Sequence, residues 1–264
     1  MKIGISGAAL GLILWPAQAA PLRPSETEAA REVEKTRTVA ADYTKRLPDF
    51  ICTETIRRYI RVALPKTWQP ADILTIKLSF SGQAEDHRLV QINGQPADEP
   101  EESLDGLVNI GEFGGMLEAV FGRATQAVFH WEGWKTVRNR PAAVYSYQVE
   151  KAHSLYMLTF DPGGYQHRQV VAYHGVVEVD WESGGVLRLV YEAGGIPKDF
   201  PMQYARTTVD YDFAEVAGRR YLLPVKSETE TGSVVLRARN IVKFEEYRKF
   251  SADSTIRFGD AEKQ

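Results

Sequence analysis

The stretch Leu74-Thr75-Ile76-Lys77-Leu78-Ser79-Phe80-Ser81 alternates apolar and polar residues without interruption. Successive side chains of a β-strand point to opposite faces, so this pattern predicts a strand with one buried and one wet face. Similar stretches recur toward the C-terminus, separated by short turn sequences such as Asn139-Arg140-Pro141 and Ser183-Gly184-Gly185. Such short connections join neighbouring strands as antiparallel hairpins, which predicts a meander.

We expect about ten or eleven strands, enough for a twisted sheet to curl into a half-barrel or barrel. Those with clear boundaries are 74–80, 87–92, 128–134, 143–149, 155–160, 168–181, 186–191, 207–213, 221–230 and 234–244. The predicted fold is therefore mainly β with some α. It is a curved antiparallel sheet (a half-barrel) with an N-terminal helix and an inserted amphipathic helix.

The N-terminal helix is predicted over residues 24–47. Ser25 and Glu28 form a capping box, in which each side chain satisfies a free backbone N–H at the helix start. Apolar or small residues then recur at spacings of three and four along one narrow stripe, and Pro48 ends the helix. The stripe consists of Ala29, Val33, Thr36, Ala40, Tyr43 and Leu47.

The inserted helix is predicted within residues 97–127, after an acidic loop at 98–102. Its apolar face consists of Phe113, Met116, Leu117, Val120 and Phe121, at spacings typical of an amphipathic helix. Gly114 and Gly115 each cost about 1 kcal/mol relative to alanine inside a helix, so this helix requires packing against another element. We expect it to act as a plug or lid on the concave side of the sheet.

Residues 1–19 have the features of a cleavable bacterial signal peptide. Lys2 precedes an uncharged stretch, and Ala17-Gln18-Ala19 supplies the small residues that a signal peptidase requires. The apolar run of about 13 residues is shorter than the roughly 20 that span a bilayer. We therefore predict cleavage after Ala19, a single mature domain over 20–264 without a transmembrane segment, and a periplasmic or secreted location.

Charge and cysteine content exclude some function classes. The chain has 32 Lys and Arg against 35 Asp and Glu, a formal net charge of −3. Nucleic-acid binding requires clustered cations, so no nucleic-acid partner is expected. The only cysteine, Cys52, excludes an internal disulfide, and its alternation with Phe50, Ile56 and Ile60 predicts a buried, inert thiol.

Two groups of titratable residues resemble catalytic or metal sites. His174, Glu178 and Asp180 share one face of a strand, but four residues along a strand span about 13 Å, too far to share one ion. Asp210 and Asp212 also share a face, but glycosidase carboxylates face each other across a cleft. Both groups are interpreted as solvated strand surface, with hydrolysis through Asp210/Asp212 or His174 as the weakest alternative.

Other chemical signatures are missing from the sequence. No serine lies in a glycine-flanked elbow, and no glycine-rich loop ends in the lysine that phosphate binding requires. We therefore predict no catalytic residues, no metal and no cofactor, and a non-catalytic protein is favoured. Trp131 and Trp181 either belong to the core or line an apolar hollow.

Parts of the sequence resemble the lipoprotein-localisation (LolA/LolB-like) fold. The similar segments are 89–94, 176–184 followed by 186–191, and 208–212 leading through Ala217-Gly218 to Leu223-Pro224. The start at 47–52 also resembles uncharacterised exported bacterial proteins. The first resemblance implies a curved antiparallel sheet wrapped round helices, with an apolar hollow that receives acyl chains.

Two functional hypotheses follow. The first is a binding or carrier protein that holds a lipid-like or other apolar ligand in the concave sheet. Its candidate contacts are Phe113, Met116, Leu117, Val120, Phe121, Trp131 and Trp181. The second is a non-catalytic envelope module with a filled core, which binds an envelope protein partner. An empty, continuous apolar hollow would distinguish the first from the second.

Overall fold

The computed structural model describes residues 23–63, 67–97, 111–161, 166–233 and 235–250. The predicted signal peptide at 1–19 and the acidic loop at 98–102 lie outside these ranges, so both stay predictions. Among the described residues, no helix is both long and apolar enough to cross a membrane.

The described part of the chain opens with two helices and continues mainly as strands. The helical elements are α1 (Glu26–Ala41), α2 (Tyr43–Arg46), α3 (Gly115–Phe121), η2 (Arg123–Thr125) and η3 (Lys151–His153). The strands of the N-terminal half are β1 (Phe50–Val62), β2 (Gln69–Ser81), β3 (Ala84–Ile92), β4 (Gln95–Pro96), β5 (Val128–Val137) and β6 (Arg140–Val149). Those that follow are β7 (Met157–Phe160), β8 (His167–Val170), β9 (Ala172–Asp180), β10 (Val186–Gly194), β11 (Tyr204–Val216), β12 (Arg219–Gly232) and β13 (Leu236–Lys249).

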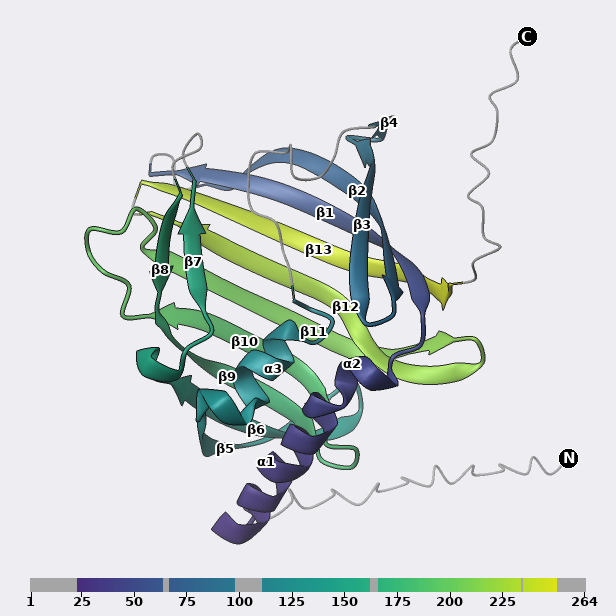
Figure 1. Cartoon of the computed structure of the whole chain (residues 1–264), viewed down its shortest axis with the longest axis vertical. Coiled ribbons are helices and arrows are strands. Elements are labelled where there is room, and N and C mark those ends of the chain that lie inside the picture. Colours follow the sequence, from purple (N-terminus) through teal and green to yellow (C-terminus); the bar gives the residue numbers. More distant parts are fainter. Residues whose placement is uncertain (1–22, 64–66, 98–110, 162–165, 234, 251–264) are drawn as a thin grey trace, which may run out of the picture.

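Eleven strands form one antiparallel sheet in the order β4-β3-β2-β1-β13-β12-β11-β10-β9-β6-β5. The predicted meander is confirmed over much of this order, except that β1 pairs with β13 and β6 pairs with β9. β4 and β5 remain at the two edges of the described sheet, so it curves without closing into a barrel. α1, α3 and the β7–β8 hairpin all lie on the same side of it (Figure 1).

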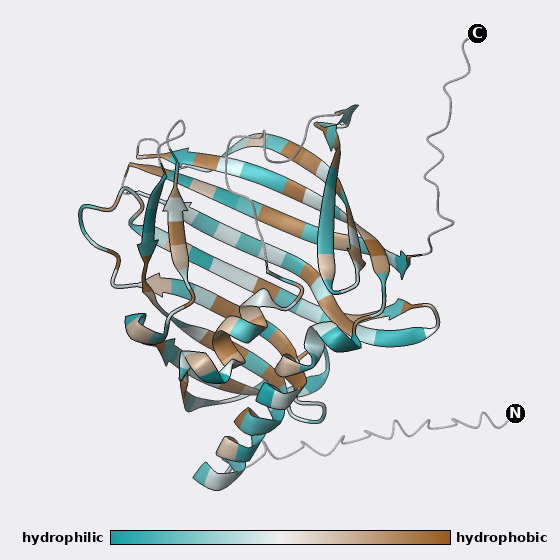
Figure 2. Ribbon diagram, viewed as in Figure 1, coloured by the Kyte–Doolittle hydropathy of each residue, from teal (hydrophilic) through white to brown (hydrophobic). Residues whose placement is uncertain are grey.

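The predicted alternation of inner-face and outer-face side chains at 74–81 is confirmed. Leu74, Ile76, Leu78 and Phe80 are all at most 3% exposed, while the residues between them lie on the outer face. The same alternation of apolar and polar residues runs along the other long strands (Figure 2). The inner face therefore carries the apolar side chains that the covering elements bury.

The inner face supports two large apolar clusters. The first joins α1 and α3 to β6, β9, β10 and β11, through residues such as Ala40, Leu117 and Leu189. The second joins β1, β2 and β13 through Phe50, Ile76 and their neighbours. Cys52 belongs to the second cluster and is buried as expected, whereas Ile60, predicted to be buried with it, is 45% exposed.

The N-terminal helix begins as predicted. The Glu28 backbone N–H donates to Ser25 Oγ at 3.3 Å, and the Ser25 backbone N–H donates to Glu28 Oε2 at 2.8 Å. The predicted single helix is interrupted, however, because Asp42 leaves helical geometry between α1 and α2. This break lets Tyr43 turn toward the sheet, where its hydroxyl donates to the Leu222 carbonyl at 2.9 Å.

The inserted helix is shorter than its predicted segment, because α3 covers only Gly115–Phe121. Gly114 has φ +139°, a value outside the helical region, so it precedes the helix. Phe113 therefore lies before α3 and packs in the second cluster, apart from the α3 residues in the first.

The predicted strand at 168–181 is divided into two. Val171 separates β8 from β9, and β7 pairs with β8 in a small sheet of its own. This small sheet lies over the large one through a third apolar cluster that joins Leu158 and Val171 to Ala205 on β11.

Candidate functional site

A hollow of about 930 Å³ lies on the concave face, between α3, the segment leading into β7, and the inner sides of β3, β10, β11 and β12. Its size falls within the range of about 300–1,000 Å³ found for small-molecule sites. The elements around it come from well-separated parts of the chain, so only the folded sheet brings them together.

Methionine is the characteristic apolar residue of this hollow. Met116 on α3, Met157 on β7 and Met202 before β11 all line it. These three are all the methionines of the sequence apart from Met1. A flexible, polarizable thioether adapts to apolar ligands of differing shape, and methionine-rich surfaces are typical of proteins that accept several partners.

Other apolar and aromatic side chains complete this part of the wall. Tyr156 and Tyr191 line the hollow with ring centroids 4.5 Å apart, and Leu155, at 62% exposure, lies at its open side. Burial raises the pKa of Tyr156 to about 12, so its phenol stays neutral at physiological pH. Met157 is 48% exposed, which leaves the hollow open to solvent beside Leu155.

The floor of the hollow carries threonines from two paired strands. Thr207 on β11 lies opposite Thr229 on β12, and their hydroxyl oxygens are 3.0 Å apart. Thr231 on β12 lies opposite Ala205 and also faces the hollow. Each threonine presents both a methyl group and a hydroxyl, so this floor can contact apolar and polar parts of a ligand.

One wall of the hollow is polar and acidic. Glu85 and His87 reach it from β3, and Glu112 reaches it from the segment before α3. His87 Nε2 lies 3.2 Å from Glu85 Oε2, and His87 Nδ1 lies 3.4 Å from Glu54 Oε2 on β1. Ser227 Oγ donates to Glu112 Oε1 at 2.9 Å. The hollow is therefore amphipathic, with an apolar side and an acidic side.

Hydrogen bonds from distant residues hold α3 in place beside the hollow. Arg37 Nη1 on α1 donates to the Phe121 carbonyl at 2.7 Å, and the Tyr173 hydroxyl on β9 donates to the Ala119 carbonyl. These donors satisfy carbonyls near the C-terminal end of the helix, which lack partners within it. Together with its buried face, they fix α3 as one wall of the hollow.

The predicted ligand contacts do not all meet at one place. Met116 lines the hollow, while Leu117, Val120 and Phe121 lie in the first apolar cluster behind it. Phe113 lies in the second cluster. Roles for these four buried residues in ligand binding stay predictions. The sequence analysis did not identify Met157 and Met202 as candidate ligand contacts. The scarcity of methionine elsewhere in the sequence is a signal that could have identified them.

Trp131 and Trp181 form a separate aromatic group with Trp134. The Trp131 and Trp134 rings lie 5.0 Å apart, and the Trp134 and Trp181 rings lie 4.8 Å apart, both edge to face. All three are partly buried against the first cluster, and none belongs to the residues that line the hollow. Their packing agrees with the alternative that they are core residues. Their role as ligand contacts stays a prediction.

The prediction that His174, Glu178 and Asp180 form a solvated face of β9 is wrong for two of these three residues. His174 is exposed, but Glu178 is 6% exposed and Asp180 is fully buried. Glu178 pairs with Lys135 at 2.6 Å and Asp180 pairs with Arg140, so cations from β5 and β6 make their burial tolerable. Among the described residues, no group of histidine, cysteine or carboxylate side chains is arranged to hold a metal ion.

Asp210 and Asp212 each pair with a different arginine. Asp210 receives two hydrogen bonds from Arg188, at 2.6 and 3.0 Å, and Asp212 lies 3.0 Å from Arg138. Asp210 also lines a highly charged groove of about 400 Å³ on the outer face. These pairs are typical of an outer sheet surface, and the two carboxylates do not face each other across a cleft.

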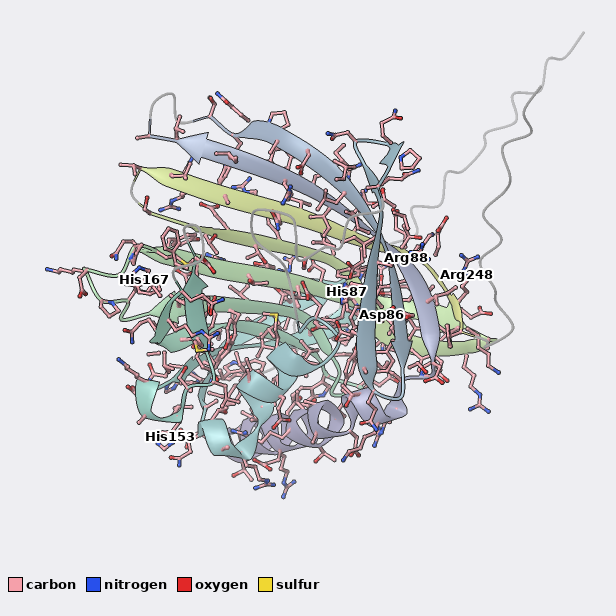
Figure 3. All side chains as sticks on the ribbon, turned by 45° about the horizontal axis from the view of Figure 1, so that its top comes forward. Asp86, His87, Arg88, His153, His167 and Arg248 are labelled. Atoms are coloured by element: carbon pink, nitrogen blue, oxygen red, sulfur yellow. The ribbon has the colours of Figure 1, made fainter. Side chains whose placement is uncertain are left out.

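The histidines do not converge on one site either. His87 lies on β3 at the concave side, while His153 ends η3 and His167 begins β8 (Figure 3). A catalytic histidine would need a nucleophile or a substrate pocket within hydrogen-bond reach. Of the labelled histidines in Figure 3, His87 is the one that lines the hollow.

Comparisons with known proteins find similar solved structures but no match by sequence. No protein-family model and no curated protein matches the sequence. The chain is similar to the crystal structure of the LolA superfamily protein NE2245 from Nitrosomonas europaea, with 10% identity, a TM-score of 0.37, and coverage of 86% of this chain and 96% of that one.

Two further solved structures are similar at the same identity of 10%. One is a putative outer membrane lipoprotein-sorting protein domain from Vibrio parahaemolyticus, with a TM-score of 0.38 and coverage of 84% and 96% of the two chains. The other is a DUF1329 family protein from Desulfovibrio piger, with a TM-score of 0.36 and coverage of 84% and 94%. At the level of structure, the chain is thus similar at low identity to a LolA superfamily protein, a lipoprotein-sorting protein domain and a DUF1329 family protein.

Proposed function

We propose that this protein binds a lipid-like or other apolar molecule in the concave hollow and carries it in the periplasm or outside the cell. The observation that supports this proposal is the open hollow of about 930 Å³, lined by Met116, Met157 and Met202. Burying an apolar chain there would gain roughly 25 cal/mol for each Å² removed from water.

A single substitution can test the hollow without disturbing the core. A side chain added at Gly115 would meet open space, because no atom lies within 4 Å of an added Cβ, and Gly115 lines the hollow. Gly115→Trp should therefore fill the hollow and weaken ligand binding by about tenfold or more, through steric exclusion of the ligand. Thr208→Trp, which lies in the groove on the outer face, is the matched control.

The experiment uses the purified mature protein and N-phenyl-1-naphthylamine, an uncharged apolar dye that fluoresces when bound. Native mass spectrometry of the same sample should reveal co-purified small molecules. We expect the parent protein and Thr208→Trp to bind the dye alike, and Gly115→Trp to bind it poorly. Absence of both bound molecules and dye binding, or equal binding by all three proteins, would contradict the proposal.

An exposed apolar rim favours the second candidate, an envelope interaction module. Ile60, Val62 and Leu236 are each 43–50% exposed, and Val62 lies opposite Leu236 at the paired ends of β1 and β13. Exposed apolar side chains that cluster together are typical of protein-binding surfaces. In that case Val62→Glu would abolish capture of an envelope partner while leaving dye binding unchanged.

The location is part of the same proposal. Cleavage after Ala19 would give a mature N-terminus at Ala20, or at Pro21 if cleavage shifts by one residue. Sequencing the N-terminus of protein recovered from the periplasmic fraction tests this directly. Recovery of intact protein that begins at Met1 from that fraction would contradict it.

A further inference from the structure

The apolar rim of Ile60, Val62 and Leu236 lies on the same face of the sheet as the hollow. Directly opposite residues of antiparallel strands point to the same face, and so do residues two apart on one strand. Thr231 of β12 lines the hollow and lies opposite Ala238 of β13, which in turn lies opposite Ile60 of β1. Thr231, Ala238 and Ile60 therefore form one row across the inner face. Val62 and Leu236 lie two residues farther along their strands and share that face.

The row is short enough for one molecule to span. Neighbouring strands lie about 4.8 Å apart, so Ile60 on β1 lies about 10 Å from Thr231, two strands away. The strands that carry this row keep one register along it, from β12 to β13 and from β13 to β1. Between the two ends lies Ala238, whose side chain is a single methyl group. The hollow and the rim are therefore joined across small and apolar side chains.

The outer face of the same strand ends is charged. Arg61 and Arg237 lie opposite each other there, and both approach Glu230, at 3.9 and 2.7 Å. On the next row of the inner face, Arg58 Nε donates to Asp72 Oδ1 at 2.6 Å, and this ion pair borders the rim. The apolar surface is thus confined to the concave side, so a molecule reaches it from the side of the hollow.

The rim is a part of the inner face that the covering elements leave in water. Ile56 and Val242, nearer the middle of the same two strands, are 4% and 1% exposed, whereas the three rim side chains are 43–50% exposed. Burying apolar surface gains roughly 25 cal/mol for each Å² removed from water. An apolar chain that continues from the hollow onto the rim would gain this free energy without a change in the fold.

We propose that the ligand has an apolar chain longer than the hollow, and that this chain crosses Thr231 and Ala238 and lies on the apolar rim. This inference rests on the proposed function, because the rest of the ligand occupies the hollow beside the methionines. The ligand class is therefore a long-chain lipid, such as one with an octadecenoyl chain. A compact apolar molecule fills the hollow alone and leaves the rim in water.

Two fatty acids that differ in chain length test this inference. Decanoate and octadecenoate share a carboxylate headgroup, and each is titrated below its aggregation limit. The full mature protein is loaded with N-phenyl-1-naphthylamine, and displacement of the dye is measured. A longer chain binds more tightly to almost any apolar site, so each ligand is compared with itself between the parent protein and its variants.

The same substitution at two valines separates the rim from the rest of the surface. Val62 and Val128 are 43% and 48% exposed, and Val128 lies on β5 at an edge of the sheet. Val62→Thr should weaken octadecenoate about threefold, and about tenfold or more once Ile60→Thr and Leu236→Thr are added. Decanoate and the dye should change less than about twofold, and Val128→Thr should change none of the three. Threonine suits a strand, so these exposed positions should tolerate it.

A fluorescent label provides a second readout. Val62→Cys can carry acrylodan, whose emission moves to shorter wavelengths in apolar surroundings. The native Cys52 is 2% exposed and burial raises the pKa of its thiol, so it reacts poorly with the label. Octadecenoate should shift the emission of the label at position 62, and decanoate should not. Neither ligand should shift the emission of a label introduced by Val128→Cys.

The outcomes are distinguishable. Equal effects of Val62→Thr and Val128→Thr on octadecenoate, or an unchanged emission of the label at position 62, would overturn the inference and leave the proposed function standing. Binding of the dye but of neither fatty acid would do the same. Loss of self-association or of capture of an envelope protein on Val62→Thr, with octadecenoate affinity unchanged, would assign the rim to a protein partner instead. Failure of the dye and both fatty acids to bind would overturn the proposed function itself.

Discussion

The hydroxyl of Tyr211 donates a hydrogen bond of 2.8 Å to the backbone carbonyl of Glu112. Both residues are buried, at 0% and 4% exposure, and they lie 99 positions apart in the sequence. The bond connects the inner face of β11 to the segment that leads into α3. It therefore connects the segment that carries Glu112, a lining residue of the hollow, to the inner face of the sheet.

Replacing Tyr211 by phenylalanine should loosen this connection. The variant keeps the ring but removes the donor from a buried carbonyl, so we expect the free energy of unfolding to fall by about 1–3 kcal/mol in urea. Backbone amides of α3 should also exchange hydrogen faster. Tyr221→Phe is the control, because Tyr221 lies on β12 and is only half-buried. Equal behaviour of the two variants would contradict this role.

The two glycines at the start of α3, Gly114 just before it and Gly115 as its first residue, should respond in opposite directions to alanine. At Gly114, φ is +139° and an added Cβ would lie 2.4 Å from Thr44 Cγ2, so Gly114→Ala should lower the free energy of unfolding by about 2 kcal/mol or more. Gly115 is helical and faces open space, so Gly115→Ala should raise it by about 0.5–1 kcal/mol. Urea denaturation measures both changes, and changes of the same sign would refute the assignment of the helix start.

Local patterns in the sequence predict the fold to a large extent. The alternation at 74–81 and the capping box of Ser25 and Glu28 are determined by neighbouring residues, and both are confirmed. Local patterns do not predict the pairing of β1 with β13, because this pairing depends on which strand edges meet when the whole chain folds. The break at Asp42 was missed for a related reason: contacts of Tyr43 with the sheet override the helical periodicity.

The candidate site was harder to predict because its parts come from distant segments. Periodicity identified Met116, but Met157 and Met202 lie in short or irregular stretches without a repeating pattern. Glu178 and Asp180 were expected in water because alternation alone cannot reveal a buried partner. Lys135 and Arg140, which make their burial tolerable, lie about 40 residues earlier in the sequence.

Oxidation of methionine offers an independent test of the hollow. Met157 is 48% exposed and Met116 is 9% exposed, so mild peroxide should convert Met157 to the sulfoxide first. A sulfoxide places a polar group on the apolar wall, so oxidised protein should bind N-phenyl-1-naphthylamine more weakly. Peptide mass spectrometry follows each site, and bound dye should slow oxidation of all three methionines. Oxidation rates that do not change with the dye would show that it binds elsewhere.

The turn after β9 depends on a buried charge. The Arg140 guanidinium donates to Asp180, and the backbone N–H groups of Glu182 and Ser183 donate to the same carboxylate at 2.9 and 3.3 Å. Burial by itself would raise the pKa of Asp180, but these hydrogen bonds outweigh it, and the pKa lies below its ordinary value. The folded protein therefore prefers the ionised carboxylate.

A lowered folded-state pKa fixes the direction of the pH dependence. The stabilisation from Asp180 is fully present above its unfolded pKa of about 4, and it is lost as the pH falls through the lower folded value. Asp180→Asn keeps an acceptor for the backbone N–H groups but removes the charge that pairs with Arg140. We expect it to lower the free energy of unfolding by about 1–3 kcal/mol at pH 7, measured in urea.

The difference between the parent protein and Asp180→Asn should narrow as the pH falls below about 4, because the parent then loses the same charge. Glu182→Gln provides the matched control. Glu182 lies 3.5 Å from Arg140 with its side chain 84% exposed, so this change should cost less than about 0.5 kcal/mol. Urea titrations of the three proteins at pH 7 and pH 3 measure these differences. A difference between the parent and Asp180→Asn that stays constant across that range would mean that the Asp180 charge does not stabilise the turn.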